Sequence, residues 1–403
     1  MAHRPRLRLV AVVLGTLALI TGCTKTDGHP TAAEIDVRTL DVGNYPTSPL
    51  EFRYSYDHGL VGGEQLAAMR LADHMVLGTE VDPDFHYLAG SDALLDRHDI
   101  EAVFANVNGP VIERHNPVVG FAITLSDKPA GQDGKETTAT RATVAVVQFA
   151  DAATAELAVK EAEATDFAVA ADINQPVSIP NIPTARAHWR PGVPTLGAMQ
   201  AHGAYLISAF IERPKPDLGI LADLARRALE NQGRLLDELP PIDGEGMLRL
   251  DNDPEGMLNR TLNPTATGLP SFSGQATFLR RGMLTRANAQ YDRAAILDKA
   301  GVDAFSYSGA GSGSTQLFRA RDAAGAEGLG PSVLEWGTYT GQVDAPEAVP
   351  GVRCGARTAE RVVTLRYRCV VPYHRYLASV ESDQIVDLHQ RAAAQYALLA
   401  NTY

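Results

Sequence analysis

The sequence is poor in cysteine, tryptophan and long apolar runs. Among 403 residues there are three cysteines and two tryptophans, and aromatic residues make up 6%. So few cysteines exclude a disulfide-rich scaffold. Beyond the N-terminal segment, no apolar run approaches the ~20 residues that a membrane-spanning helix needs. We therefore expect the rest of the chain to be a soluble globular protein.

Positive charge is also scarce. Lys and Arg total 36 against 48 Asp and Glu, which gives a net charge of −12. The first 22 residues hold three arginines and no acid, so without them the net charge is −15. Because such a chain is repelled by phosphate backbones, we expect no nucleic-acid partner.

Known catalytic patterns are missing. In the Ser- and Gly-rich stretch 306–315, no serine has a glycine two residues away on both sides, so the nucleophile elbow of hydrolases is absent. The stretch also lacks a phosphate-loop ending, and we interpret it as a flexible loop before a strand at 316–319. The eleven histidines form no tight metal-binding pattern. The sequence predicts no catalytic residue, no metal and no cofactor.

The N-terminus resembles the signal peptide and lipobox of bacterial lipoproteins. Three arginines precede the apolar run Leu9–Ile20. The end of this run and the next three residues read Leu-Ile-Thr-Gly-Cys, with the cysteine at position 23. That run is too short for a permanent membrane helix. We expect cleavage of residues 1–22, lipidation of Cys23 and anchoring of an extracytoplasmic protein to the cell membrane. An ordinary secretory signal with an incidental cysteine is the alternative.

The two remaining cysteines, Cys354 and Cys369, are predicted to form a disulfide. Outside the cytoplasm a cysteine pair is most simply oxidised. Their 15-residue spacing suits adjacent strands, and closing such a loop contributes ~3 kcal/mol by restricting the unfolded chain. A metal site is the alternative, but no histidine or carboxylate at short spacing flanks both cysteines.

An internal repeat appears at an offset of 171 residues. Asp-Ala-Ala-Thr-Ala-Glu at 151–156 corresponds to Asp-Ala-Ala-Gly-Ala-Glu at 322–327, and Tyr-Leu-Ile-Ser-Ala at 205–209 corresponds to Tyr-Leu-Ala-Ser-Val at 376–380. Two blocks at one offset indicate two homologous halves. Chance similarity between alanine-rich segments is the alternative.

The periodicity of each half predicts strand, helix, strand, strand, helix. Residues 142–149 are β-rich and precede a helix that Asp151 can cap, and further strands are expected within 185–189 and 195–211. The fold class is therefore α+β: two homologous tandem halves, each a mainly antiparallel sheet with helices packed on one face. The last helix of each half has an apolar stripe, formed by Leu221, Leu224, Ala228 and Leu235 and by Ile385, Leu388, Ala392 and Leu399.

These features predict the domain boundaries. A signal peptide at 1–22 is followed by a lipidated tether at 23–50, a first α+β repeat domain at 51–240, a linker at 241–256, and a second α+β repeat domain at 257–403 that contains the disulfide. The tether and the linker are assigned from their Pro, Gly and Asp content.

The candidate ligand-binding residues are His188, Trp189, Tyr373, His374 and Tyr376. Neighbouring aromatic and basic side chains can stack on and hydrogen-bond a polar ring such as a sugar. The alternative is that a histidine beside an aromatic residue at a strand end only packs there.

Four segments together resemble an uncharacterised family of actinobacterial cell-envelope lipoproteins, found in mycobacteria, nocardiae and their relatives. They are the lipobox, Leu-Asp-Val-Gly-Asn-Tyr-Pro-Thr at 40–47, Val-Gln-Phe-Ala-Asp-Ala-Ala-Thr-Ala at 147–155 and Asp-Leu-His-Gln-Arg-Ala-Ala-Ala-Gln-Tyr at 387–396. The resemblance covers nearly all of the mature chain. It implies localisation and architecture, and no activity.

The anchor, the duplication and the missing nucleophile favour a non-enzymatic lipoprotein that binds an envelope glycan, lipid or protein. A solute-binding lipoprotein of a transporter is one alternative, but it requires parallel βαβ halves. A hydrolase of envelope polymers is another, and it requires a carboxylate pair or a Ser/His pair in one pocket.

A Cys23→Ala variant tests the anchor. We expect the wild type to enter the detergent phase of a Triton X-114 separation and the variant to stay in the aqueous phase, because only the former carries acyl chains. Identical partitioning of the two proteins would contradict lipidation.

Overall fold

The computed structural model describes residues 34–50, 58–129, 138–265, 268–310, 313–358 and 365–402. The expected signal peptide and Cys23 lie outside these ranges. The chain divides into a unit of residues 1–35 and a unit of residues 36–403, and the second unit contains the fold described below.

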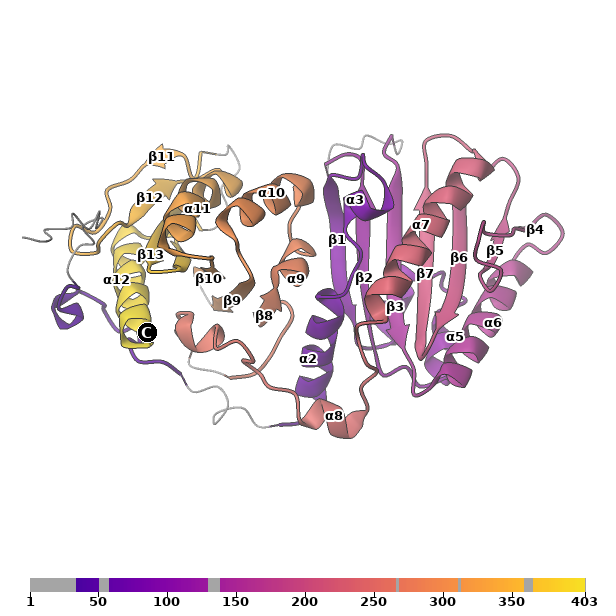
Figure 1. Ribbon diagram of the computed structural model, residues 1–403, viewed down its shortest axis with the longest axis horizontal. Coiled ribbons are helices and arrows are strands. Elements are labelled where there is room, and N and C mark those ends of the chain that lie inside the picture. The colour runs from indigo at the N-terminus through magenta and orange to yellow at the C-terminus, as the bar shows by residue number, and fades with distance from the viewer. Residues whose placement is uncertain are drawn as a thin grey trace, which may run out of the picture. The chain divides into compact units, whose positions relative to one another are not determined.

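Two seven-stranded sheets of matching topology form the second unit (Figure 1). The first domain has the order β1-β2-β3-β7-β6-β5-β4, and the second has β8-β9-β10-β14-β13-β12-β11, read from its β8 edge. Each pair of neighbouring strands is antiparallel. The strands are β1 (Tyr87–Leu94), β2 (Val119–Ser126), β3 (Arg141–Gln148), β4 (Gln175–Pro176), β5 (Arg186–Trp189), β6 (Thr195–His202), β7 (Tyr205–Glu212), β8 (Gln275–Leu279), β9 (Ala304–Ala310), β10 (Gly313–Arg319), β11 (Gly341–Gln342), β12 (Arg353–Ala356), β13 (Tyr367–Tyr373) and β14 (Tyr376–Ser382).

The helices repeat in the same way. Asp151 accepts a hydrogen bond from the Thr154 N–H at the start of α6, and Asp322 accepts one from the Gly325 N–H at the start of α11, both at 2.8 Å. The predicted duplication and α+β class are therefore confirmed. The helices are η1 (Val37–Thr39), α2 (Leu60–Ala72), α3 (Gly78–Val81), α4 (Arg97–Val103), α5 (Gly109–Arg114), α6 (Ala152–Ala168), α7 (Leu218–Leu236), α8 (Gly244–Leu248), η2 (Leu258–Arg260), α9 (Arg280–Leu284), α10 (Gln290–Ala300), α11 (Ala323–Trp336) and α12 (Ile385–Thr402).

Helices cover both faces of the first sheet, where we expected them on one face. Val144 and Val146 of β3 point into a core with Leu221 and Leu224 of α7. The alternate residues of β3 belong to a second core, which contains the buried side of α6. Because successive strand residues point to opposite faces, α6 and α7 must lie on opposite sides of the sheet.

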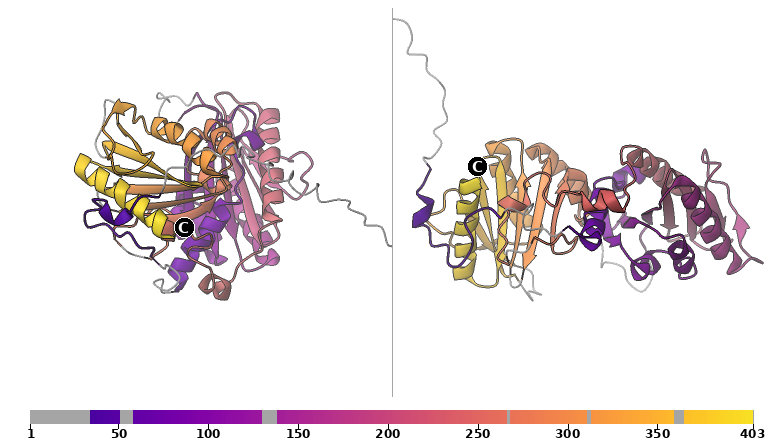
Figure 2. Two further views of the ribbon diagram at one scale, coloured as in Figure 1. Left: turned by 60° about the vertical axis from the view of Figure 1, so that its left-hand side comes forward. Right: turned by 90° about the horizontal axis from the view of Figure 1, so that it is seen from below.

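The second sheet is covered in the same way by α11 and α12 (Figure 2). Val370 of β13 packs with Val333 of α11. On the other face, the ring of Tyr373 contacts the ring of Tyr396 of α12, with centroids 5.3 Å apart. Both sheets thus have two buried faces, which explains why most of their strands are apolar at consecutive positions.

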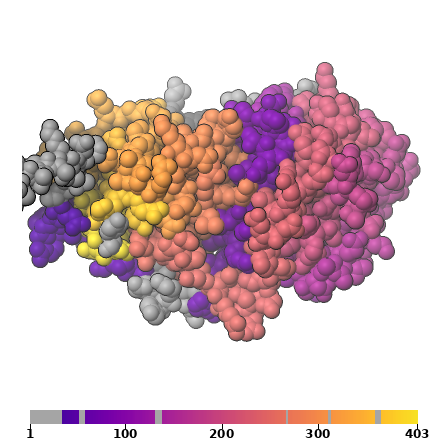
Figure 3. Space-filling view, viewed as in Figure 1, coloured from indigo at the N-terminus to yellow at the C-terminus, as the bar shows by residue number. Residues whose placement is uncertain are grey.

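Three segments that were expected to be irregular are ordered by contacts. Of the stretch predicted as a flexible loop, residues 306–310 belong to β9 and residues 313–315 to β10, and Ser306 and Ser308 are buried. Within the expected linker, the backbone of Ile242 is held at both its N–H and its carbonyl by the side chain of Gln148. The described part of the expected tether also lies against the second domain (Figure 3). There the Arg391 guanidinium lies over the Tyr45 ring, 4.8 Å from its centroid.

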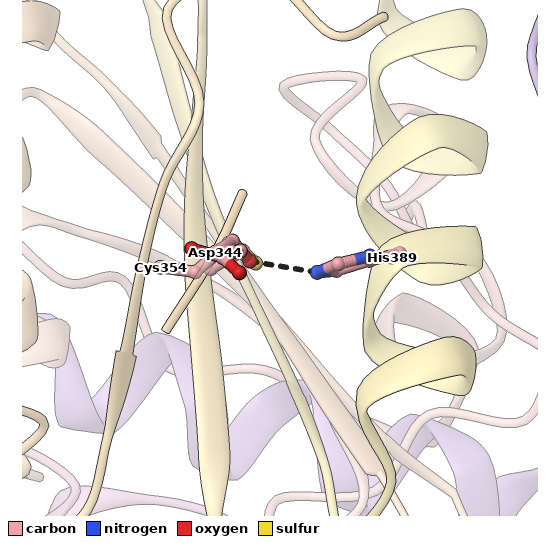
Figure 4. Close-up of a disulfide and its surroundings, with 4 residues drawn as sticks. Asp344, Cys354 and His389 are labelled. Carbon is pink, nitrogen blue, oxygen red and sulfur yellow. Dashed lines mark hydrogen bonds between the residues drawn. A yellow bond between two sulfur atoms is a disulfide. The ribbon is translucent and has the colours of Figure 1, made fainter. Parts of the chain in front are cut away.

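The predicted disulfide between Cys354 and Cys369 is confirmed. The two residues face each other across β12 and β13 in the antiparallel register. Beside the bond, His389 of α12 donates a hydrogen bond from Nε2 to the carbonyl oxygen of Asp344 at 2.8 Å (Figure 4). The disulfide is a local brace of the second domain, because the first domain has no cysteine.

Contacts also join the two domains within this unit. Asp73, which follows α2, accepts hydrogen bonds on Oδ1 from the backbone N–H groups of Leu279 (2.9 Å) and Gly282 (3.0 Å) at the start of α9. Next to it, Arg281 forms a two-pronged ion pair with Glu80, at 2.8 and 2.9 Å. Burial raises the pKa of Asp73 to about 7, against the opposing effect of the two N–H donors and the charge of Arg281.

Asp73→Asn tests this arrangement, because asparagine keeps the Oδ1 acceptor and removes the titration. The folded-state pKa of Asp73 lies above its unfolded value near 3.8, so its contribution to stability is present below pH 4 and is lost as the pH rises toward 7. We expect the unfolding free energy of wild type to fall relative to that of the variant between about pH 4 and 7, by at most ~1.4 kcal/mol per pH unit. Urea titrations across this range measure the difference, and parallel pH profiles would refute the assignment.

Candidate functional site

A cleft of about 410 Å³ opens on the α6 face of the first sheet. Its floor is formed by β6 and β7, and its walls are the α4–α5 turn, the C-terminal end of α6 and the turn after β5. The lining residues are Val103, Phe104, Ala105, Asn108, Asp166, Val169, Asn174, His188, Arg190, Val193, Thr195, Gly197, Met199, Ser208 and Phe210.

Asn108 is the most informative residue of the cleft. It precedes α5 and is 1% exposed, yet neither its Oδ1 nor its Nδ2 has a hydrogen-bond partner among the described residues. A buried amide without partners carries a desolvation penalty of about 1–3 kcal/mol. An asparagine in that state is suited to a ligand that both accepts and donates a hydrogen bond.

The rest of the cleft combines apolar walls with charged groups near its opening. Val169 and Phe210 are large apolar residues that remain exposed, 61% and 40% respectively. Arg190 is exposed and Asp166 is half-buried, so both signs of charge are within the lining. A ligand with an apolar surface and several polar groups matches this mixture.

His188 is the one predicted ligand-binding residue that lines this cleft. Its Nδ1 lies 3.2 Å from Glu163 Oε1, and its ring meets Phe167 edge-on at 5.5 Å. Trp189 is the next residue along β5, where side chains alternate between faces, and it is not among the lining residues. Its Nε1 donates a hydrogen bond to the Val193 carbonyl oxygen at 2.8 Å.

The other three predicted residues lie in the second domain, at the β13–β14 hairpin. Tyr373 and Tyr376 pair across the strands and are 5% and 8% exposed. His374 is in the turn between them, with a φ of 47°. None of the three lines the cleft, so the structure does not gather the five predicted residues into one site.

The equivalent position in the second domain is filled. Gly197 and Phe210 face each other on β6 and β7, and their repeat counterparts are Arg368 and Glu381, which face each other on β13 and β14. The Arg368 guanidinium pairs with the Glu381 carboxylate, whose Oε1 also accepts a hydrogen bond from the Tyr339 hydroxyl at 2.9 Å. An ion pair thus occupies the space that the missing side chain of Gly197 leaves open.

Burial by itself would raise the pKa of Glu381. The charge of Arg368 and hydrogen bonds from Ser314, Arg368 and Tyr339 outweigh burial, so the pKa of Glu381 lies below its ordinary value. The polar groups at this position of the second domain are therefore satisfied by one another, whereas the amide of Asn108 in the first domain has no hydrogen-bond partner among the described residues.

Asn108 was not found from the sequence. An asparagine followed by Gly109 and Pro110 is an ordinary signal for a turn that starts a helix. In the structure Asn108 does precede the helix α5. The cleft that it lines is formed in part by β6 and β7, roughly a hundred residues further along the chain.

No helix in the described ranges is both long enough and apolar enough to cross a membrane. Within the same ranges, no three His, Cys, Asp or Glu side chains are grouped so that they could hold a metal ion.

Residues 55–252 match the family model described as "Domain of unknown function (DUF7373) N-terminal", and residues 257–402 match its C-terminal counterpart. Comparison with curated proteins gives no match. Among solved structures, the extracellular domain of PknH from Mycobacterium tuberculosis covers 42% of this chain and 95% of its own, at 12% identity and a TM-score of 0.28. A likeness at that TM-score carries no argument about this chain.

The contrast between the two domains predicts opposite responses to substitution. We expect Asn108→Ala to leave the unfolding free energy unchanged or to raise it by about 1 kcal/mol, because an unsatisfied amide is removed. We expect Glu381→Gln to lower it by about 3–5 kcal/mol, because Arg368 is left buried without its counter-charge. Urea unfolding of both variants measures these changes, and a large loss for Asn108→Ala would show that its amide has partners.

Proposed function

This chain belongs to the DUF7373 family, a domain family of unknown function, and we propose that it is a non-enzymatic, ligand-binding lipoprotein of the cell envelope. The observation that carries the proposal is the buried amide of Asn108, which lines the cleft and has no hydrogen-bond partner within the described ranges. A group that folding leaves unsatisfied is explained if a ligand satisfies it.

The chemistry of the cleft favours a glycan with acetamido groups. An acetamido carbonyl accepts a hydrogen bond from Nδ2 of Asn108, and its N–H donates one to Oδ1, so a single substituent satisfies both atoms. Phe210, which is 40% exposed, offers aromatic surface for the apolar face of a sugar ring. Asp166, Arg190 and Ser208 are available for its hydroxyl groups.

The expected envelope location supports the same choice. A protein cleaved before Cys23 and lipidated there would be held outside the cytoplasmic membrane, among the polymers of an actinobacterial wall. The resemblance of the whole chain to actinobacterial envelope lipoproteins agrees with that location. Transport and hydrolysis remain the alternatives, although the antiparallel sheets are not the parallel βαβ halves that the transport alternative requires.

Binding of triacetylchitotriose tests the proposal, with cellotriose as a probe that carries hydroxyl groups in place of the acetamido groups. At about 100 times its dissociation constant, triacetylchitotriose should raise the unfolding free energy by ~2.7 kcal/mol in a thermal-shift experiment. Asn108→Ala should weaken its binding by about 5- to 150-fold, the equivalent of 1–3 kcal/mol.

Asn106→Ala is the matched control, because Asn106 is an exposed asparagine in the same turn and does not line the cleft. It should leave the affinity unchanged. Equal binding of cellotriose, or an Asn108→Ala variant that binds as the wild type does, would contradict the assignment. Cleavage of the oligosaccharide by the wild-type protein would contradict a non-enzymatic role.

A further inference from the structure

A second cavity, of about 200 Å³, lies entirely within the second domain. It is enclosed by β9 and β10, the segment from α9 into α10, and the last residue of α11. Its lining contains four aromatic side chains and two arginines but no carboxylate. The lining residues are Met283, Arg286, Arg293, Phe305, Tyr307, Gln316, Phe318 and Trp336.

The two arginines are held by aromatic rings and not by acids. The Arg286 guanidinium lies 4.8 Å from the Phe272 ring centroid and 5.5 Å from that of Tyr307, and it donates a hydrogen bond to the Phe272 carbonyl oxygen at 2.7 Å. The Arg293 guanidinium lies 5.0 Å from the centroid of Trp336. These ring contacts hold the two guanidinium groups in place and leave the remaining N–H groups of both available.

Neither guanidinium has a carboxylate within ion-pair distance among the described residues. Nε of Arg293 is buried and has no hydrogen-bond partner there. Burial lowers the pKa of both arginines, and the neighbouring charge of Arg368 adds to the effect on Arg293. A guanidinium nevertheless stays protonated in proteins, so this cavity contains two positive charges.

Two acids act on this part of the protein, Asp92 on Arg286 and Glu381 on Tyr307, and neither forms an ion pair with Arg286 or Arg293. Glu381 is already engaged by Arg368, Ser314 and Tyr339. Asp92 acts on Arg286 only through its charge, without an ion pair. An unpaired buried charge is strongly unfavourable, so a mobile anion has a place to bind here.

The fold itself does not require charge at this position. Tyr307 and Gln316 face each other on β9 and β10, and their repeat counterparts in the first domain, Ala122 and Ala145, face each other on β2 and β3. Both alanines are buried in an apolar core. The same topology is therefore stable with small apolar residues at these two positions.

We propose that this cavity binds a small oxyanion, a carboxylate or a phosphate group, between the guanidinium groups of Arg286 and Arg293. Guanidinium groups bind both kinds of oxyanion through paired, charge-assisted hydrogen bonds. Gln316 adds an amide donor, and the aromatic wall accommodates an apolar body attached to the anion. The site is independent of the cleft in the first domain.

Trp336 provides the measurement. The chain has two tryptophans, so a Trp189→Phe background leaves Trp336 as the only indole reporter. Inorganic phosphate, acetate and benzoate are each titrated in a buffer of fixed chloride concentration, with neutral benzamide as the uncharged analogue. We expect a saturable change in Trp336 fluorescence with at least one anion and none with benzamide. A response to phosphate alone would identify a phosphate site. A response to acetate or benzoate would identify a carboxylate site.

Arg293→Gln should weaken that binding by at least 10-fold, because a charge-assisted pair of hydrogen bonds is lost. The variant should fold, since it removes an unneutralised charge, and its unfolding temperature without anion should equal or exceed that of the parent. Arg321→Gln is the control, because the Arg321 side chain is 64% exposed, and it should leave binding within two-fold.

The proposal fails if none of the three anions gives a saturable response, if benzamide gives the same response, or if Arg293→Gln binds as the parent does. The acetamido-sugar experiment uses other residues in the other domain, so either result can fail without the other.

Discussion

Each sheet of this protein must be covered on both faces, and that requirement controls what the two domains can do. Strands such as β3 place apolar side chains on alternate sides, so one helix on each side is needed to exclude water. In the first domain α7 covers one face of the sheet and α6 covers the other. Where α6 ends, at Ala168, the ends of β6 and β7 are left without a helix above them, and the cleft opens at that place.

Duplication allowed the two copies to solve the same packing problem differently. Gly197 and Phe210 face each other in the first domain. At the equivalent positions of the second domain, Arg368 and Glu381 face each other. Conversely, two alanines that close the core beneath α6 correspond to Tyr307 and Gln316, which line a cavity beside two stacked arginines. Each domain thus has one filled and one open position, with opposite electrostatic character: a neutral amide in the first and paired cations in the second.

Much of the architecture could be predicted because it depends on local or repeated signals. Asp151 and Asp322 each precede a helix that they cap, and the apolar stripes of α7 and α12 are buried at Leu224 and Leu388. The segment 195–211 was predicted as one strand, but it contains β6 and most of β7, because Gly203, with a φ of 56°, allows a tight turn between them. The edge strands β1 and β8 and the second helix face were not predicted, because an apolar residue does not indicate which of two layers will cover it. The candidate site was predicted only at His188.

The sequence by itself determined the duplication, the α+β class and the disulfide, since each follows from spacing along one chain: an offset of 171, the periods of strands and helices, and two cysteines placed to face each other across neighbouring strands. Only the tertiary structure decided which polar groups are buried without partners. No sequence pattern marks Asn108, Arg286 or Arg293. Their importance depends on the absence of partner side chains around them in the described structure. Hydrogen-bond and charge satisfaction is a property of three-dimensional neighbourhoods, so no local pattern encodes it.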